Sequence, residues 1–282
     1  MNYECLICQV KSLPQRLDKF KVADKDRDFA VSELVKKIAN IDLENSYSPE
    51  ITRDILARLK DFSWVEDPYQ KEKEDSNRYL LNKYPEFQDL MRKSAAPFHT
   101  ALRLAIAGNI IDFGPTHEFD VDRTIEKVLT SDFSIDHSNQ LKTAIGNAKT
   151  ILYLADNSGE IVLDRLFLET INHPNIWVAF RGKPVLNDVT QKEIVDVGID
   201  KIAKVISNGD DAPSTLLHRV SKEFLSIYNS ADLIISKGMG NYEGLMNETD
   251  KRLFYLLMIK CQVIGKNIGA EVGDFVVKQN SV

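Results

Sequence analysis

The residues best suited to chemistry stand in one turn, which contains Asp156, Asn157, Ser158, Gly159 and Glu160 and directly follows the apolar run at 151–155. An acid and an amide at this place would lie above the carboxyl end of a buried strand, where α/β sheets bind ligands. Lys and Arg are absent from the turn, so a phosphate held there would need backbone N–H groups, a helix N-terminus, a metal or a cation from elsewhere. We interpret the acid and the amide as oxygen ligands for a divalent cation.

The elements that must position this turn are short apolar runs that alternate with helical patterns. Strands are predicted at 151–155, 176–180, 203–206, 233–236 and 254–259, with 275–277 as an edge strand, and helices at 161–170, 189–197 and 213–228. Strands joined by helix-length connections imply parallel pairing with right-handed crossovers. The pattern predicts a Rossmann-like three-layer α/β/α sandwich with a mostly parallel sheet.

Turns that follow neighbouring strands of such a sheet converge in space. Asp188 comes after the second predicted strand, and with Asp156 and Asn157 it would give a metal three protein ligands. Waters or substrate oxygens would complete the octahedron that Mg²⁺ or Mn²⁺ prefers, and Co²⁺ and Ni²⁺ stay open. Such a metal polarises a phosphoryl oxygen and positions a water, while Lys237 after the fourth strand would neutralise phosphate charge. We therefore predict that Asp156, Asn157 and Lys237 are catalytic, with direct water attack preferred over a phosphoenzyme on Asp156.

Other polar groups of these turns are expected to hold the substrate. The backbone N–H groups of Ser158 and Gly159 would take phosphate oxygens. Glu243 would hold sugar hydroxyls or orient the lysine. Arg181 and Asn241, from the turns after the second and fourth strands, complete this group.

Each motif also has a purely structural interpretation. Asn157 with Glu160, and Asp188 with Gln191, have the spacing of helix capping boxes. Each pair alone is more often a cap than a ligand set. Four consecutive turns that carry acids, amides, glycines and cations together favour a site.

The bulk properties restrict the remaining possibilities. The chain has 282 residues and a formal charge of −6, which argues against a nucleic-acid-binding surface. Its start lacks the pattern of a signal peptide, and no apolar run is long enough to span a membrane. Three cysteines form no disulfide framework, so we expect a cytoplasmic protein. Residues 1–148 are dense in charge and helical in pattern, which predicts an all-helical N-terminal region or cap before a Rossmann-like domain at 149–282. The oligomeric state stays open.

The motifs taken together resemble the damage-control phosphatase family, a former domain of unknown function that includes members labelled as protein-glutamate methyltransferases. The resemblance rests on the turn at 156–160, Asn187 with Asp188, and the stretch 237–243. Upstream, Arg103 and the stretch 107–112, which contains Asn109, match a further family signature. Cysteines at 5, 8 and 261 match its cysteine-bearing subgroup, so the likeness spans nearly the whole chain.

This resemblance implies a helical region packed on a Rossmann-like domain. It also implies a divalent-metal-dependent phosphatase that acts on small phosphorylated metabolites, often sugar phosphates or damaged cofactor precursors. By position, Asp156, Asn157 and Asp188 fall on the family's metal ligands and Lys237 on its phosphate-contacting lysine. Asn109 and Glu243 fall in motifs that line its pocket.

The three cysteines offer a second site. Cys5 and Cys8 have the spacing of half a zinc site, and Cys261 would be a third ligand only if the fold brings it near. A structural metal at Cys5 and Cys8 is weighed against plain half-buried thiols.

Two rival functions stay in view. An S-adenosylmethionine-dependent carboxyl methyltransferase would need a glycine-rich loop, which the turn at 156–160 lacks. A non-catalytic protein that binds a phosphorylated metabolite would use the same pocket without turnover.

Overall fold

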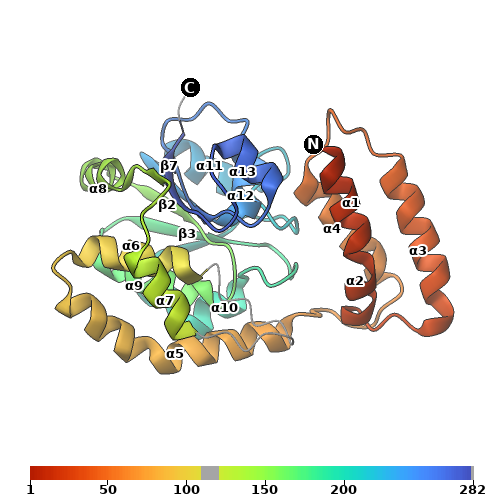
Figure 1. Ribbon diagram of the computed structural model, residues 1–282, viewed down its shortest axis with the longest axis horizontal. Coiled ribbons are helices and arrows are strands. Elements are labelled where there is room, and N and C mark those ends of the chain that lie inside the picture. Colours follow the sequence, from red (N-terminus) through yellow and green to blue (C-terminus); the bar gives the residue numbers. More distant parts are fainter. Residues whose placement is uncertain (109–120, 281–282) are drawn as a thin grey trace.

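Seven strands form one sheet in the computed structural model, which describes residues 1–108 and 121–280 (Figure 1). The strands are β1 (Ile135–Asp136), β2 (Ile151–Leu154), β3 (Ile176–Phe180), β4 (Lys204–Ser207), β5 (Leu233–Lys237), β6 (Leu253–Met258) and β7 (Phe275–Gln279). Their order across the sheet is β1-β7-β6-β5-β2-β3-β4. Strands β6, β5, β2, β3 and β4 pair in parallel, and β7 runs antiparallel to β6. The mostly parallel α/β sheet predicted from the sequence is confirmed.

One detail of the predicted sheet is wrong. The strand at 275–277 was expected at an edge, but β7 pairs with β6 on one side and with β1 on the other. Strand β1 has only two residues, Ile135 and Asp136. A strand this short carries no alternating pattern that sequence reasoning could detect.

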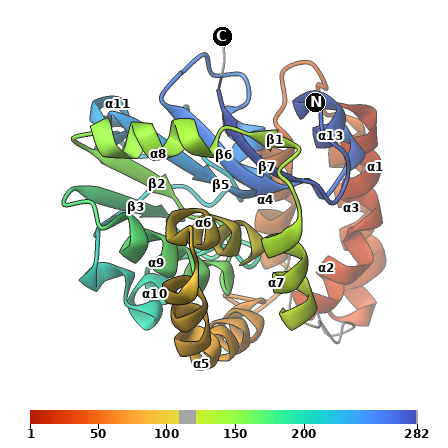
Figure 2. The ribbon, with the colours of Figure 1, turned by 60° about the vertical axis from the view of Figure 1, so that its left-hand side comes forward.

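The central strands read as unbroken apolar runs because helices cover both faces of the sheet. Successive side chains of a strand point to opposite faces. Ile151 and Tyr153 therefore join a core with helices α5–α9, whereas Leu152 and Leu154 join a second core with α11–α13. Figure 2 shows α5, α6, α9 and α10 on one side of the sheet. The three-layer arrangement follows from this alternation.

Thirteen α-helices are found in the described residues. They are α1 (Tyr3–Lys11), α2 (Leu13–Lys19), α3 (Asp24–Ala39), α4 (Ser48–Lys60), α5 (Gln70–Lys93), α6 (Pro97–Ala107), α7 (Val121–Thr130), α8 (Ser138–Asn147), α9 (Glu160–Ile171), α10 (Gln191–Val197), α11 (Lys222–Ser230), α12 (Gly238–Leu245) and α13 (Gln262–Ile268). The helix predicted at 213–228 begins only at Lys222, where Ser221 accepts a hydrogen bond from the N–H of Phe224 as its N-cap. None of the helices described is both long and apolar enough to cross a bilayer.

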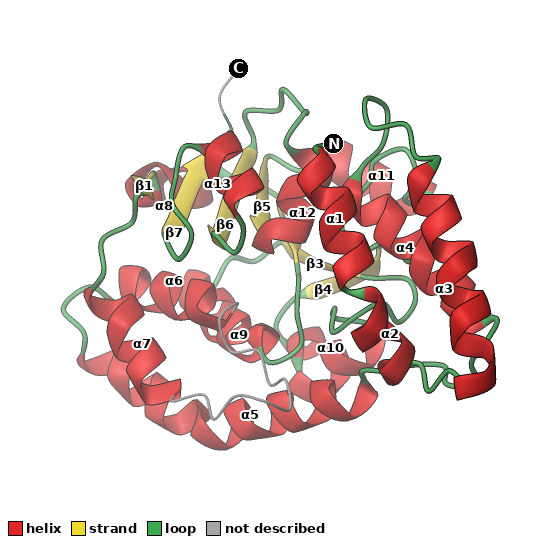
Figure 3. Cartoon of the chain, turned by 45° about the vertical axis from the view of Figure 1, so that its right-hand side comes forward, coloured by secondary structure: helices red, strands yellow, loops and turns green. Residues whose placement is uncertain are grey.

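Helices α1–α4 form a lobe with a hydrophobic core of its own, which we call the N-terminal lobe (residues 1–62). Figure 3 shows this lobe beside the sheet, next to α12. Helices α5–α8 also precede residue 149, but their buried side chains belong to the core that contains Ile151 and Tyr153 of β2. Strand β1 is part of the sheet itself. The predicted division into residues 1–148 and 149–282 stays a prediction.

Candidate metal and phosphate site

The turns after β2 and β3 meet at the carboxyl end of the sheet. Because β2 and β3 are parallel neighbours, Asn157 and Asp188 come opposite each other and form an isolated β-bridge. The N–H of Ser158 donates to Asn187 O at 2.9 Å, and the N–H of Val189 donates to Asp156 O at 2.9 Å. Backbone pairing thus brings the three predicted metal ligands together.

The guanidinium of Arg181 lies between the two carboxylates of this pair of turns. Its Nε donates to Asp188 Oδ2 at 2.7 Å, and its Nη2 lies 3.6 Å from Asp156 Oδ1. Asn157 Nδ2 donates to Asp156 Oδ2 at 2.7 Å. Arg181, Asp156 and Asp188 are all buried. The structure thus places Arg181 on the two acids that were expected to bind metal.

Burial makes the ionised carboxylates costly. Burial and, to a lesser extent, the nearby Asp188 and Glu160 carboxylates together raise the pKa of Asp156 to about 8, against the opposing charge of Arg181. Burial also raises the pKa of Asp188, against the opposing charge of Arg181. The Arg181 guanidinium therefore offsets only part of the cost of ionising these two carboxyls.

Lys237, at the end of β5, is fully buried. Its Nζ donates to Ala105 O at 2.9 Å, to Glu160 Oε1 at 2.5 Å and to Asp164 Oδ1. These three acceptors use all the N–H groups of an ammonium. The phosphate contact predicted for Lys237 stays a prediction, and in this structure the lysine instead neutralises acids of α9.

Asp164 forms a buried ionic group with Lys237 and Glu160. The hydroxyl of Tyr153 donates to Asp164 Oδ1 at 2.7 Å. Burial raises the pKa of Asp164 to about 7, with Lys237 opposing the shift. Sequence reasoning missed Asp164, although a visible signal existed, since Glu160 and Asp164 are acids one helical turn apart in the otherwise apolar start of α9.

The N–H groups of Ser158 and Gly159 hold the turn itself. Ser158 donates to Asn187 O, and Gly159 donates to the side-chain Oδ1 of Asn77 at 2.6 Å. Gly159 has φ +80°, a left-handed conformation that suits glycine. Phosphate binding by these two N–H groups stays a prediction and would require these bonds to open. Asn77, from α5, was not found from the sequence.

The remaining predicted substrate residues lie in different settings. Asn241 Nδ2 donates to Ala155 O and Lys237 O, and its Oδ1 accepts from Thr215 Oγ1, so its amide holds the start of α12. Glu243 lines a cavity of about 490 Å³ between the N-terminal lobe and helices α12 and α13. Asn109 falls outside the described residues.

The structural interpretation of these motifs does not hold. Helix α9 has Gly159 as its N-cap and lacks a side-chain capping bond. Helix α10 has a capping box, but Thr190 and Glu193 form it rather than Asp188 and Gln191. Neither Asn157 nor Asp188 therefore caps a helix through its side chain.

The donor set fits a hard divalent cation. Two carboxylates and an amide oxygen from adjacent turns are ligands that Mg²⁺ and Mn²⁺ accept. Arg181 Nη2 and Ser158 Oγ are buried here without a hydrogen-bond partner, so the site has hydrogen-bonding capacity that the protein itself does not use. Among the described residues, the buried acids and cations of the site leave a formal charge of −2; they are Asp156, Glu160, Asp164, Asp188, Arg181 and Lys237.

The cysteines do not form a comparable set. Cys5 is half-buried on α1, Cys8 is exposed and Cys261 is half-buried. Over residues 1–108 and 121–280, no group of three or more His, Cys, Asp and Glu side chains is arranged to hold a metal. The structural metal at Cys5 and Cys8 stays a prediction.

Comparisons with known proteins find relatives over nearly the whole length of the chain. The family model described as the damage-control phosphatase ARMT1-like domain matches residues 1–276. An uncharacterized protein of Methanocaldococcus jannaschii is 34% identical over 97% of this chain and 93% of its own length. A damage-control phosphatase of Pyrococcus horikoshii is 32% identical over 99% of this chain and 98% of its own length.

A solved structure agrees with these sequence matches. The crystal structure of a DUF89 family protein from Pyrococcus horikoshii has a TM-score of 0.90 to this chain at 30% identity, and covers 100% of this chain and 99% of the other. The resemblance inferred from the turn motifs is thereby confirmed. The chain belongs to the damage-control phosphatase family.

Proposed function

We propose that this protein is a divalent-metal-dependent phosphatase that hydrolyses small phosphorylated metabolites. The observation that carries the proposal is the pairing of the turns after β2 and β3, which brings the buried Asp156 and Asp188 together with the half-buried Asn157. The excess negative charge among the buried side chains supports a cation there. The family supports phosphate ester hydrolysis, since relatives in Pyrococcus horikoshii and Archaeoglobus fulgidus are named damage-control phosphatases.

The residues of the chain divide the work as follows. Asp156, Asp188 and the amide oxygen of Asn157 would hold the cation. When bound, such a cation supplies charge stabilisation for a phosphoryl oxygen and lowers the pKa of a coordinated water. Arg181, whose Nη2 has no hydrogen-bond partner and lies 3.6 Å from Asp156 Oδ1, would then turn part of its charge toward a phosphate oxygen.

Lys237 would favour phosphate binding without contacting the phosphate itself. By neutralising Glu160 and Asp164 it keeps two further carboxylates from repelling an incoming anion. Water attack on the phosphorus is the proposed route, because Asp156 would be committed to holding the cation and would then be a poor nucleophile.

A non-catalytic metabolite sensor is the rival function, since it would use the same buried acids. The methyltransferase alternative has weaker support, because the turn after β2 has one glycine, Gly159, and its N–H is already bound to Asn77. A cofactor that needs close backbone approach finds less room there.

The test is release of inorganic phosphate from a panel of sugar phosphates, nucleotides and cofactor fragments, with Mg²⁺, Mn²⁺, Co²⁺ or Ni²⁺ added to chelator-treated protein. We expect turnover that depends on the metal and is lost in Asp156→Asn and Asp188→Asn. Asp250→Asn is the matched control, because Asp250 pairs with Arg252 in the loop before β6. Binding of a phosphorylated compound without phosphate release would favour the sensor.

A further inference from the structure

Side chains of the turn that ends in Asp188 pack against the N-terminal lobe rather than against the sheet. Val185, only 4% exposed, belongs to the hydrophobic core of the N-terminal lobe, whose other buried members all lie between residues 13 and 59. Leu186 packs against the same core. Two consecutive apolar side chains of this turn are thus held by a different lobe from the one that carries β3.

The backbone of the anchored turn is under strain. Leu186 has φ +44°, in the left-handed region that costs a side chain with a Cβ about 1 kcal/mol or more. The turn closes directly after it, because the N–H of Asp188 donates to Val185 O at 3.1 Å. A leucine in this conformation persists only where its surroundings hold it, and the core of the N-terminal lobe provides that hold.

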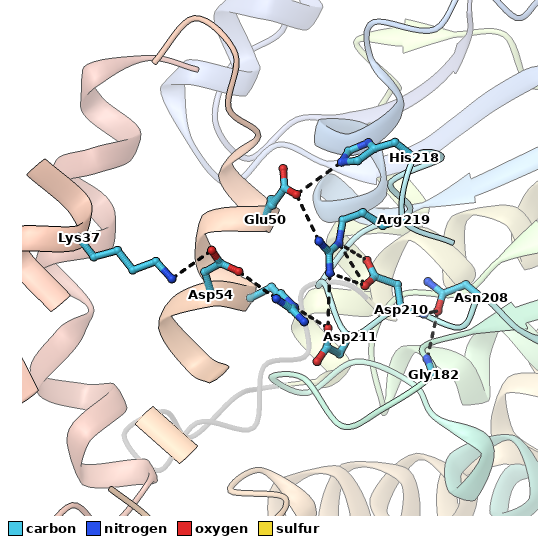
Figure 4. Close-up of polar contacts among 10 residues, drawn as sticks. Lys37, Glu50, Asp54, Gly182, Asn208, Asp210, Asp211, His218 and Arg219 are labelled. Carbon is cyan, nitrogen blue, oxygen red and sulfur yellow. Dashed lines mark hydrogen bonds and ion pairs between the residues drawn. The ribbon is translucent and has the colours of Figure 1, made fainter. Parts of the chain in front are cut away.

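A second tie joins the same lobe to the neighbouring turn after β4 (Figure 4). Arg53 of α4 donates through Nε to Asp211 Oδ1 at 2.6 Å. Arg219 pairs with Asp210 at 3.0 Å and with Glu50 of α4 at 3.4 Å. These ion pairs fix the turn at 208–211 against the lobe.

The turn after β4 in turn supports the turn after β3. The N–H of Gly182 donates to Asp210 O at 2.8 Å and to Asn208 Oδ1 at 3.0 Å. A Cβ at position 182 would come within 2.8 Å of the Gly209 backbone, so the two turns touch closely. The lobe therefore holds the segment 181–188 from both of its ends.

We propose that the N-terminal lobe positions the Asp188 carboxylate, with Leu186 as the positioning residue. The lobe does so by seating Val185 and Leu186 in its own core and by bracing the turn at 208–211. The placement of Asp188 relative to Asp156 therefore depends on docking of the lobe. The link to metal affinity rests on the proposed function, whereas the link between lobe and turn does not.

The experiment compares three variants by hydrogen–deuterium exchange of the metal-free protein. Leu186→Ala removes one of the two apolar anchors, and Leu186→Met keeps an apolar side chain of similar volume. Leu34→Ala is the matched control, because Leu34 is fully buried in the same core but belongs to α3. All are measured where circular dichroism shows native helix content.

We expect the peptide covering 185–190 to exchange about 10-fold faster in Leu186→Ala, and to keep wild-type protection in Leu186→Met and Leu34→Ala. Wild-type exchange of this peptide in Leu186→Ala, or equally fast exchange in Leu34→Ala with a folded lobe, overturns the proposal.

Calorimetric titration with Mn²⁺ gives the second readout. Loss of a group that orients a ligand typically weakens metal binding by about 10- to 100-fold, so Leu186→Ala should show a Kd about 10-fold higher than wild type and Leu34→Ala should not. An unchanged Kd in Leu186→Ala overturns the positioning role. If the wild type itself binds no Mn²⁺, the proposed function fails, and the exchange result alone decides whether the lobe holds the turn.

Discussion

Arg181 Nε donates to Asp188 Oδ2 at 2.7 Å in a place where both side chains are almost wholly buried. A second nitrogen of the same guanidinium lies 3.6 Å from Asp156 Oδ1. Without a metal, Arg181 is thus the positive charge nearest to both acids among the residues that the structure describes. A bound divalent ion would take over part of that role.

This arrangement makes a prediction for Arg181→Gln. Loss of the guanidinium removes the cation that pairs with both buried carboxylates, so the metal-free variant should be less stable than wild type by about 3 kcal/mol. Mn²⁺ should restore more stability to the variant than it adds to wild type, because the ion supplies the missing charge. Thermal unfolding with chelator and with saturating Mn²⁺ measures both effects.

The control for this prediction is Arg252→Gln. Arg252 pairs with Asp250 and with backbone carbonyls at 228, 229 and 231. Its loss should lower stability without changing the gain that Mn²⁺ gives. Equal gains from Mn²⁺ in Arg181→Gln and wild type would count against a metal between the two acids.

A second prediction concerns Lys237. Lys237→Met replaces the ammonium by an apolar group of similar length and leaves Glu160 and Asp164 buried without it. Breaking a buried ionic group by removing one partner costs about 3–5 kcal/mol. Urea unfolding of the metal-free protein measures this loss.

The double variant Lys237→Met with Asp164→Asn shows whether the loss of stability in Lys237→Met comes from an uncompensated buried charge or from lost packing. Removing one carboxylate should return part of the stability, so the two changes should not be additive. If both changes simply add, the carboxylate of Asp164 is not what makes the loss of the lysine costly.

Much of the sheet could be predicted because its strands are buried on both faces. Runs such as 151–155 and 176–180 are apolar throughout, and they became β2 and β3 within one residue at each end. The two-residue β1 and the irregular chain before Lys222 lack such periodicity. There the local pattern was too short or was overridden by tertiary packing.

The site was predictable only in part, for a related reason. Residues that directly follow strands are brought together by the register of the sheet, so Asp156, Asn157 and Asp188 could be grouped from the sequence. Partners from distant segments leave no local sign. Asn77 lies 82 residues along the chain from Gly159, whose N–H donates a hydrogen bond to the Asn77 side chain. The burial of Lys237 is likewise visible only in the folded chain.

The contact between Asn77 and Gly159 gives a third prediction. Asn77→Ala leaves a buried backbone N–H without an acceptor, which costs about 1–3 kcal/mol. The same change should raise the Kd for Mn²⁺ about 10-fold, because the turn that carries Asp156 and Asn157 loses its support from α5. Unfolding and calorimetric titration measure the two effects.

Ser76→Ala is the matched control for Asn77→Ala. Ser76 lies beside Asn77 on α5, is equally buried and donates to Lys73 O rather than to the turn. Its loss should leave the Kd for Mn²⁺ at the wild-type value. A Kd that rises equally in both variants would mean that α5 as a whole, and not the Asn77 amide, supports the turn.

The fourth prediction is a dependence of stability on pH through Glu243. Burial raises the pKa of this carboxyl to about 7, although a hydrogen bond with Ser48 opposes the shift. An acid whose pKa is higher in the folded than in the unfolded protein binds its proton more tightly when folded. Its contribution to stability is therefore greatest below its unfolded pKa, falls as the pH rises to about 7, and stays low above that.

Other buried acids, Asp156 and Asp164 among them, titrate in overlapping ranges, so the contribution of Glu243 has to be isolated by difference. Glu243→Gln keeps the shape of the side chain and removes its titration. The free energy of unfolding of wild type minus that of the variant should fall by on the order of 3 kcal/mol between pH 4 and pH 8. Urea unfolding at several pH values gives this difference. Because Glu243 lines the cavity between the N-terminal lobe and α12, a difference that does not change with pH would mean that water reaches the carboxyl and the lobe does not close over it.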